Sequence, residues 1–236
     1  MLKRVNIYIL VITFLYGFSF YSNLYSEDNL NLEVLFGFNF SKINGGYIWQ
    51  RPTLSSSNLN FGFNLGIGLT YKYASFMDLN PQLELIKKGS KWGIPVIPFL
   101  YDSDYIIYEI SYIQLSFNHL VHICTSESRK IDLLLGIYGA YELSAEEEWI
   151  FENKPEDGLP IGNLEDYISD YDFGLSLGLK IISIKKRCSF LFRYDHGMKS
   201  INKTEDKRAS TDFYNKSSQM MRSLLITLSI NFKSFN

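Results

Sequence analysis

The stretch LNFGFNLGIGLTYKY, residues 59–73, constrains the fold more than any other part of the chain. Its apolar side chains alternate with small or polar ones, which is the period-two pattern of a β-strand and not the period of a helix. Such a strand exceeds the usual globular length of about five or six residues but suits a tilted strand that crosses a bilayer. The apolar set is Leu59, Phe61, Phe63, Leu65, Ile67, Leu69 and Tyr71, and the opposite set is Asn60, Gly62, Asn64, Gly66, Gly68, Thr70 and Lys72.

The same alternation recurs along the chain and predicts eight strands. No apolar run after residue 28 is long enough for a transmembrane helix. A mature chain in a membrane would therefore have to be a β-barrel, because only helices and closed barrels satisfy their backbone polar groups in lipid. The predicted strands are residues 31–43, 59–73, 75–88, 106–123, 130–144, 170–184, 187–199 and 220–232.

Two of these strands are irregular. Pro81 removes a ladder donor, so we expect a bulge or a rim position near it. The apolar residues of 106–123 change parity, which indicates a bulge or the point where the strand leaves the membrane. They are Ile106, Tyr108 and Ile110 on one parity, and Ile113, Leu115, Phe117 and Val121 on the other.

Long and short connections alternate between the predicted strands. This alternation is typical of outer-membrane barrels, which have short periplasmic turns and long extracellular loops. We therefore predict an all-β fold, an eight-stranded antiparallel up-and-down transmembrane β-barrel over residues 27–236, or ten strands if a long loop hides a hairpin. The long connections are residues 44–58, 89–105, 145–169 and 200–219, and the short ones are 73–74, 125–129 and 185–186.

Residues 1–26 have the layout of a cleaved secretory signal peptide. A short basic start precedes an almost wholly apolar run over residues 5–21, and Ser26 ends a candidate cleavage site. A retained signal-anchor helix is the alternative, because this apolar run nearly spans a bilayer. Export through a signal peptide would place the mature chain in a bacterial outer membrane.

Several short pieces of the chain carry a family resemblance. They are, in order, GFNFSKI, NPQLELIKKGSKW, YIQLSFNHLVHI, GIYGAYE, DYDFGLSLGLKI, RYDHGMKSI and ITLSINF. Their order resembles the PorT-like family of small outer-membrane β-barrels, over residues 30–232. The resemblance implies an eight-stranded barrel in the outer membrane of a diderm bacterium, with no shared catalytic residue. It also suggests an accessory role in protein secretion.

Charged residues on the inward parity are expected to meet in the barrel lumen. Buried charges must pair or become very costly, so a ladder of ion pairs is expected. Because side chains just fill an eight-stranded lumen, a plugged interior is favoured over a small pore. The predicted lumen charge network comprises Glu33, Lys72, Glu84, Asp132, Glu142, Asp172, Lys180, Arg193 and Asp195.

The histidines are not predicted to form an enzyme or metal site. Asp195 and His196 are adjacent in a strand and point to opposite faces, which argues against a lipase-like triad with Ser200. His119 and His122 are three residues apart and also lie on opposite faces, which is poor geometry for a shared metal ion. We expect no catalytic residue, no metal and no cofactor.

The two cysteines, Cys124 and Cys188, fall near the periplasmic rim. Two cysteines in an exported protein raise the question of a disulfide. By parity Cys124 faces inward and Cys188 outward, on strands that are not neighbours. A disulfide is therefore not expected.

The long loops carry the candidate contacts with other molecules. The acidic loop after residue 144 lacks the spacing and turn glycine of a calcium loop, so a solvated surface loop is expected. Loop aromatics could recognise a ligand, although contact with lipid headgroups is favoured. The candidate surface-loop contacts are Trp49, Arg51, Trp92, Glu146, Glu147, Glu148 and Trp149.

These features favour a non-enzymatic outer-membrane protein that is structural or binds other molecules through its loops. The alternatives are a narrow channel for small solutes, an accessory barrel for protein secretion, and an outer-membrane lipid-modifying enzyme. We expect a monomer whose partners are outer-membrane lipids, the barrel-assembly machinery and an unidentified extracellular ligand or secretion partner. A formal net charge of −2 gives no reason to expect a nucleic-acid partner.

Overall fold

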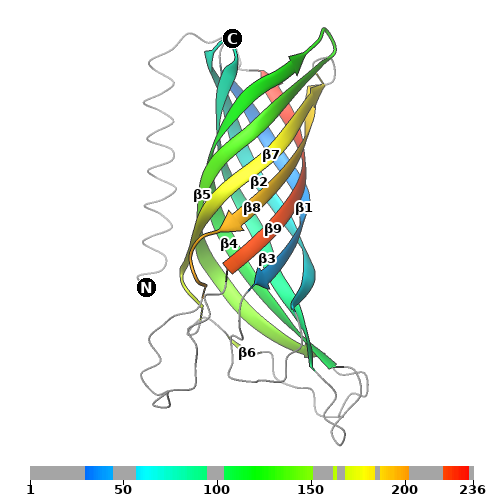
Figure 1. Ribbon diagram of the computed structural model, residues 1–236, viewed down its shortest axis with the longest axis vertical. Helices are drawn as coiled ribbons and strands as arrows, with labels where there is room; N and C mark the ends of the chain where they lie inside the picture. Colours follow the sequence, from blue (N-terminus) through cyan, green and yellow to red (C-terminus); the bar gives the residue numbers. More distant parts are fainter. Residues whose placement is uncertain are drawn as a thin grey trace, which may run out of the picture.

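One antiparallel sheet closes on itself to form a barrel (Figure 1). The computed structural model describes residues 30–44, 57–94, 104–150, 162–163, 168–183, 187–201 and 220–233. Among these residues the strands follow in the order β4-β3-β2-β1-β9-β8-β7-β5-β6, and pairing of β4 with β5 closes the ring. Closure leaves no long unpaired edge. The predicted eight-stranded antiparallel barrel is confirmed.

Eight long strands form the wall, and β4 and β5 are the longest at 22 residues each. A ninth strand, β6 (Gly162–Asn163), pairs with Glu146 and Glu147 of β5. The described part of the connection between β5 and β7 thus adds a two-residue strand antiparallel to the end of β5, and not the two further long strands of a ten-stranded wall. The long strands are β1 (Leu30–Asn44), β2 (Ser57–Ala74), β3 (Met77–Ile94), β4 (Asp104–Thr125), β5 (Arg129–Ile150), β7 (Tyr171–Ser183), β8 (Cys188–Gly197) and β9 (Met220–Lys233).

The two ends of the barrel differ. We call one the short-turn end, because the β2–β3 and β4–β5 turns lie there together with the start of β1 and the end of β9; it is at the top of Figure 1. We call the other the long-loop end, where β6 pairs with the extended β5. The predicted signal peptide, residues 1–26, lies outside the described residues. Nowhere in the described part of the chain is there a helix long and apolar enough to cross a membrane.

The outward face of the wall is apolar. Burial alternates residue by residue along β1 and β7, as the period of two requires. Large side chains such as Phe36, Phe61 and Leu177 are about half exposed, at 51%, 56% and 52%. Phe38 and Phe61 stack across the β1–β2 pair with ring centroids 5.3 Å apart. The apolar belt therefore lies outside the barrel and the polar residues lie inside it.

Of the two alternatives expected for Pro81, a bulge or a rim position, the bulge is wrong; Pro81 lies four residues after the start of β3 at the short-turn end. The pairs Gly68–Gln82 and Tyr71–Leu79 keep one register on either side of it. The carbonyl of Leu69, opposite Pro81, accepts a hydrogen bond from the side-chain amide of Asn80 at 2.9 Å instead. A side-chain donor thus replaces the N–H that proline lacks.

The parity change in residues 106–123 is also not a bulge in β4. The β3–β4 register is unbroken from Met77–Val121 to Ile94–Asp104. Ile106, Tyr108 and Ile110 instead point inward and are at most 2% exposed. The apolar residues change parity because the lumen itself becomes apolar toward the long-loop end.

Both cysteines are free, in agreement with the prediction that they form no disulfide. The inward orientation predicted for Cys124 is wrong, because Cys124 is exposed. The β4–β5 ladder is irregular between His122 and Cys124, so Cys124 pairs with Ile131 on the outward face. The unpaired residue between them reverses the parity.

Two glycines on the neighbouring strands β5 and β7 test how tightly the lumen is packed. Gly174 is buried in the lumen, and Gly139, exposed on the outward face, is the control. A Cβ at Gly174 would overlap the carbonyl oxygen of His196, whereas a Cβ at Gly139 would meet nothing within 4 Å. We expect Gly174→Ala to lower the free energy of unfolding by about 1–3 kcal/mol through overpacking, and Gly139→Ala to leave it unchanged. Urea unfolding of the refolded barrel measures both. Equal stability of the two variants would contradict this description of the lumen.

Candidate functional site

A buried ion-pair cluster fills the middle of the lumen. The guanidinium of Arg193, from β8, lies 2.7 Å from Glu84 of β3 and 3.0 Å from Asp195 of its own strand. Arg193 also donates to Gln82 at 2.7 Å. Glu84 accepts a further hydrogen bond from Asn64 at 2.9 Å. Each charge is at most 1% exposed, so the pairing offsets a large cost of desolvation.

A chain of polar contacts extends this cluster toward the long-loop end. Asp195 accepts from Gln114 at 2.9 Å, and Gln114 accepts from Lys88 at 2.8 Å. The Lys88 ammonium lies 4.5 Å from the centroid of the Tyr138 ring and 3.8 Å from Asp172. Tyr138 donates to Asp172 at 3.0 Å. With this extension the cluster links side chains of six strands, β2, β3, β4, β5, β7 and β8, across the barrel.

A second ion pair lies between the Arg193 cluster and the short-turn end. Lys180 of β7 contacts the two carboxylate oxygens of Glu33 of β1 at 2.6 and 2.8 Å. Thr70 donates to the same carboxylate at 2.7 Å. Both charges are at most 2% exposed. This pair spans the lumen between strands that are not neighbours.

A third polar group lies at the short-turn end. Lys130 donates to Asp78 at 2.7 Å, and its ammonium lies 3.5 Å from Asp132. The imidazole of His122 lies between the same two carboxylates, 2.9 Å from Asp132 and 3.3 Å from Asp78. Of this group only Asp132 was predicted as a lumen charge, although His122 and Lys130 also share the inward parity of their strands.

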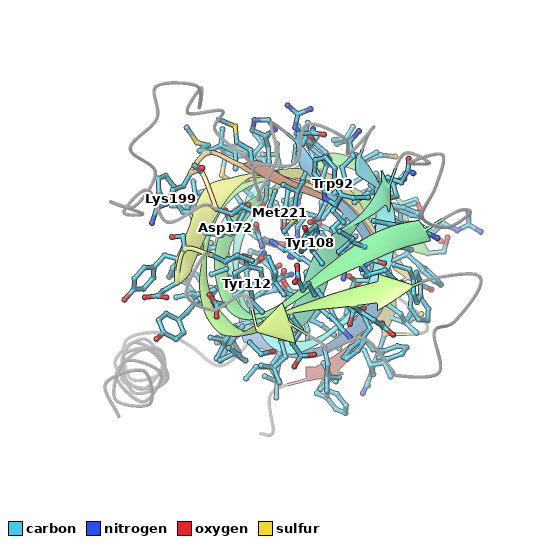
Figure 2. All side chains as sticks on the ribbon, turned by 90° about the horizontal axis from the view of Figure 1, so that it is seen from below. Trp92, Tyr108, Tyr112, Asp172, Lys199 and Met221 are labelled. Carbon is cyan, nitrogen blue, oxygen red and sulfur yellow. The ribbon has the colours of Figure 1, made fainter. Side chains whose placement is uncertain are left out.

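Apolar and aromatic side chains close the long-loop end. Figure 2 looks into the barrel from this end and shows Tyr108, Tyr112 and Met221 within the ring of strands. Ile168 and Ile201, from the segments before β7 and after β8, pack into the same cluster and are at most 1% exposed. The amide of Ser169 donates to the carbonyl of Ile201 at 2.6 Å, which ties the two segments together.

The structure brings together most of the predicted lumen charges. Glu142 is also buried, near the long-loop end. Lys72 does not join the network, because it is exposed where β2 continues past its last pair with β1. Lys88 and Asp78 were missed, although both share the parity of Glu84. Following that parity along the whole of β3 would have found them.

The predicted surface-loop contacts are placed differently from the expectation. Trp92 is 4% exposed, because β3 continues to Ile94 and turns this side chain inward (Figure 2). Residues 146–148 belong to β5 and not to a loop, with Glu146 and Glu148 exposed and Glu147 half-buried. Trp49, Arg51 and the side chain of Trp149 lie outside the described residues.

The histidines are separated from each other. His119 is exposed on the outward face, beside Tyr73, while His122 points into the lumen. Asp195 is bound within the Arg193 cluster, and His196 contacts Tyr194 instead. The geometry therefore contains no Asp195–His196 pair that could activate a nucleophile.

An apolar groove of about 430 Å³ lies over Gly139. Gly139 is exposed on the outward face, and its missing side chain leaves the space open. The groove is aromatic as well as aliphatic. Its outward-facing lining includes Leu115, Phe117, Ile137, Tyr141, Tyr171 and Phe173.

Comparison with known proteins finds similar structures but no sequence relative. No protein-family model matches the chain, and no curated protein does. One similar structure is that of Ail, the attachment invasion locus protein of Yersinia pestis, in complex with the heparin analogue sucrose octasulfate. Its sequence is 12% identical and its TM-score is 0.41, and the match covers 86% of this chain and 99% of Ail. Neisserial surface protein A is 11% identical with a TM-score of 0.39, at 85% and 97% coverage. The outer membrane protein AlkL is 11% identical with a TM-score of 0.35, at 90% and 94% coverage. Sequence identities and TM-scores this low assign neither a family nor a function to the chain.

The Arg193 cluster makes a quantitative prediction. Arg193→Met removes the cation between Glu84 and Asp195 and is expected to cost about 3–5 kcal/mol of unfolding free energy, because it leaves buried carboxylates unpaired. Lys72→Met, the control, removes an exposed positive charge and should leave stability unchanged. Urea unfolding in lipid vesicles measures the difference.

Neutralising the orphaned carboxylates separates the electrostatic cost from lost packing. Glu84→Gln and Asp195→Asn, added to Arg193→Met, are expected to restore part of the loss. If Arg193→Met were as stable as Lys72→Met, the buried ion pairs of Arg193 would not be needed for the stability of the barrel.

Proposed function

We propose that this protein is a non-enzymatic outer-membrane barrel, a rigid scaffold that holds its long loops at the cell surface. The observation that carries the proposal is the inverted polarity of the barrel. Its outward face is apolar, and its buried charges and hydrogen-bonding side chains lie inside. A protein surrounded by water would not expose so large an apolar surface.

The apolar belt supports outer-membrane lipids as the partner of the wall. Outward side chains on β1, β2, β7, β8 and β9 are Phe, Leu, Ile or Val over consecutive outward positions. The groove over Gly139 continues this apolar surface and has room for a hydrocarbon chain. Insertion of such a wall is the task of the barrel-assembly machinery, which we include among the partners.

The filled lumen argues against the narrow channel. A channel would need a continuous water path past Arg193, yet this side chain is fully buried and is held by Glu84, Gln82 and Asp195. Beyond it, the aromatic cluster closes the long-loop end. We therefore propose that the barrel does not conduct.

Molecular recognition is then assigned to the long-loop end. Binding residues are commonly carried on loops that a rigid scaffold positions. The role as an accessory to secretion rests on the family resemblance and would use the same loops. We propose a monomer, because the closed barrel offers no strand edge to a second copy.

Epitope insertion tests the proposed orientation. A tag within residues 202–219 should react with antibody on intact cells, since the end of β8 and the start of β9, which this segment connects, lie at the long-loop end. A tag after Glu127, in the β4–β5 turn, should react only after the outer membrane is permeabilised. The reverse pattern, or recovery of both proteins in the soluble periplasmic fraction, would refute the proposal.

Electrical recording tests the closed lumen. The purified barrel in planar bilayers is expected to give no stepwise conductance, with a general porin as the positive control. The barrel form is verified in the same preparation by its faster electrophoretic migration before boiling. Steps from a heat-modifiable preparation would favour the channel alternative.

A further inference from the structure

Three potential metal ligands meet at the short-turn end of the lumen. Asp78 of β3, His122 of β4 and Asp132 of β5 each offer one donor atom, and these atoms lie within 4.8 Å of one another. The two carboxylates are 5% and 0% exposed, whereas the imidazole is 11% exposed. The group is therefore built into the wall but can be reached from the short-turn end.

The hydrogen bonds within this group leave some potential metal-binding atoms unused. A neutral imidazole has one N–H, so when Nδ1 of His122 donates to Asp132, the Nε2 lone pair faces Oδ1 of Asp78 at 3.3 Å. Oδ1 of Asp78 and Oδ2 of Asp132 are buried and accept no hydrogen bond. Two lone pairs that face each other in a buried site are stabilised by a cation between them.

Lys130 supplies only part of the positive charge. Its ammonium lies 2.7 Å from Asp78 and 3.5 Å from Asp132, so with His122 in its neutral form one positive charge faces two carboxylates. The Lys130 side chain is 19% exposed, which allows its ammonium to move into solvent. A divalent ion in its place would balance both carboxylates.

We infer that Asp78, His122 and Asp132 form a binding site for a divalent transition-metal ion, Zn²⁺ by its donor set. One imidazole nitrogen with carboxylate oxygens suits zinc better than calcium or magnesium, which prefer oxygen ligands alone. Two donors of a tetrahedral zinc site with bonds of about 2.0–2.1 Å lie about 3.3–3.4 Å apart, which matches the Nε2–Oδ1 distance. In this geometry Nε2 of His122 and Oδ1 of Asp78 are the direct ligands, while Asp132 accepts the Nδ1–H, orients the imidazole and adds negative charge beside the ion.

The proposed ion would cross-link three neighbouring strands at the rim. The β4–β5 turn lies directly beyond the site, and the amide of His122 donates to the carbonyl of Phe76 in the β2–β3 turn. An ion that binds only the folded barrel stabilises it against unfolding. The site is independent of the loops at the long-loop end, so its test does not depend on the proposed function.

Calorimetric titration of Zn²⁺ into the full chain in detergent micelles, without a polyhistidine tag, tests the site. The wild-type protein should bind one equivalent, and His122→Asn should weaken binding by about 10- to 100-fold or more. His119→Asn is the matched control, because it removes an outward-facing histidine of the same strand and should bind as the wild type does. Zinc should also raise the urea midpoint of the wild type and of His119→Asn, but not that of His122→Asn.

Lys130→Gln separates a metal site from a purely structural salt-bridge cluster. If Lys130 competes with the metal, this variant binds Zn²⁺ more tightly than the wild type. If the cluster is only structural, the variant is less stable and binds no zinc. Unchanged zinc affinity in His122→Asn, or no binding by either the wild type or Lys130→Gln in a heat-modifiable preparation, would overturn the inference.

Discussion

The β4–β5 ladder is the interaction on which the rest of the structure depends. β4 and β5 pair over nearly their whole length, and this pairing turns an open sheet into a ring. A ring of eight strands satisfies its backbone polar groups within the wall, which an open sheet in a bilayer cannot do. It is also so narrow that every inward side chain must pack against another one.

The narrow ring explains why the inward charged side chains lie so close to their partners. Charges at the inward positions are desolvated by closure, so each needs an opposite charge or a hydrogen-bond partner within reach. Glu33 meets Lys180, and Arg193 meets Glu84 and Asp195. The interior then changes in character along the axis, from the carboxylate–histidine group at the short-turn end, through the ion pairs, to the aromatic cluster at the long-loop end.

The wall with its lumen, the short-turn end and the long-loop end differ in their chemistry. The wall presents an apolar surface outward, and most of the buried charges of the lumen are paired, so both parts serve the stability of the barrel. The short-turn end keeps one group, around His122, in which Oδ1 of Asp78 and Oδ2 of Asp132 are buried and accept no hydrogen bond. In the function proposed above, recognition of other molecules falls to the long-loop end, because buried side chains fill the lumen.

The sequence by itself determined the period of two, the number of long strands and the alternation of long and short connections, because these are local properties of the chain. It also identified most of the inward charges by parity, and the absence of a disulfide. It did not determine which charges meet, where the apolar residues of β4 point, or that Trp92 is buried. Only closure decided these, since the stagger of the strands places Arg193 beside Glu84, and His122 between Asp78 and Asp132, from positions that are distant or on different strands. Parity tells which side of the wall a residue faces, whereas the tertiary structure decides its height and its neighbours.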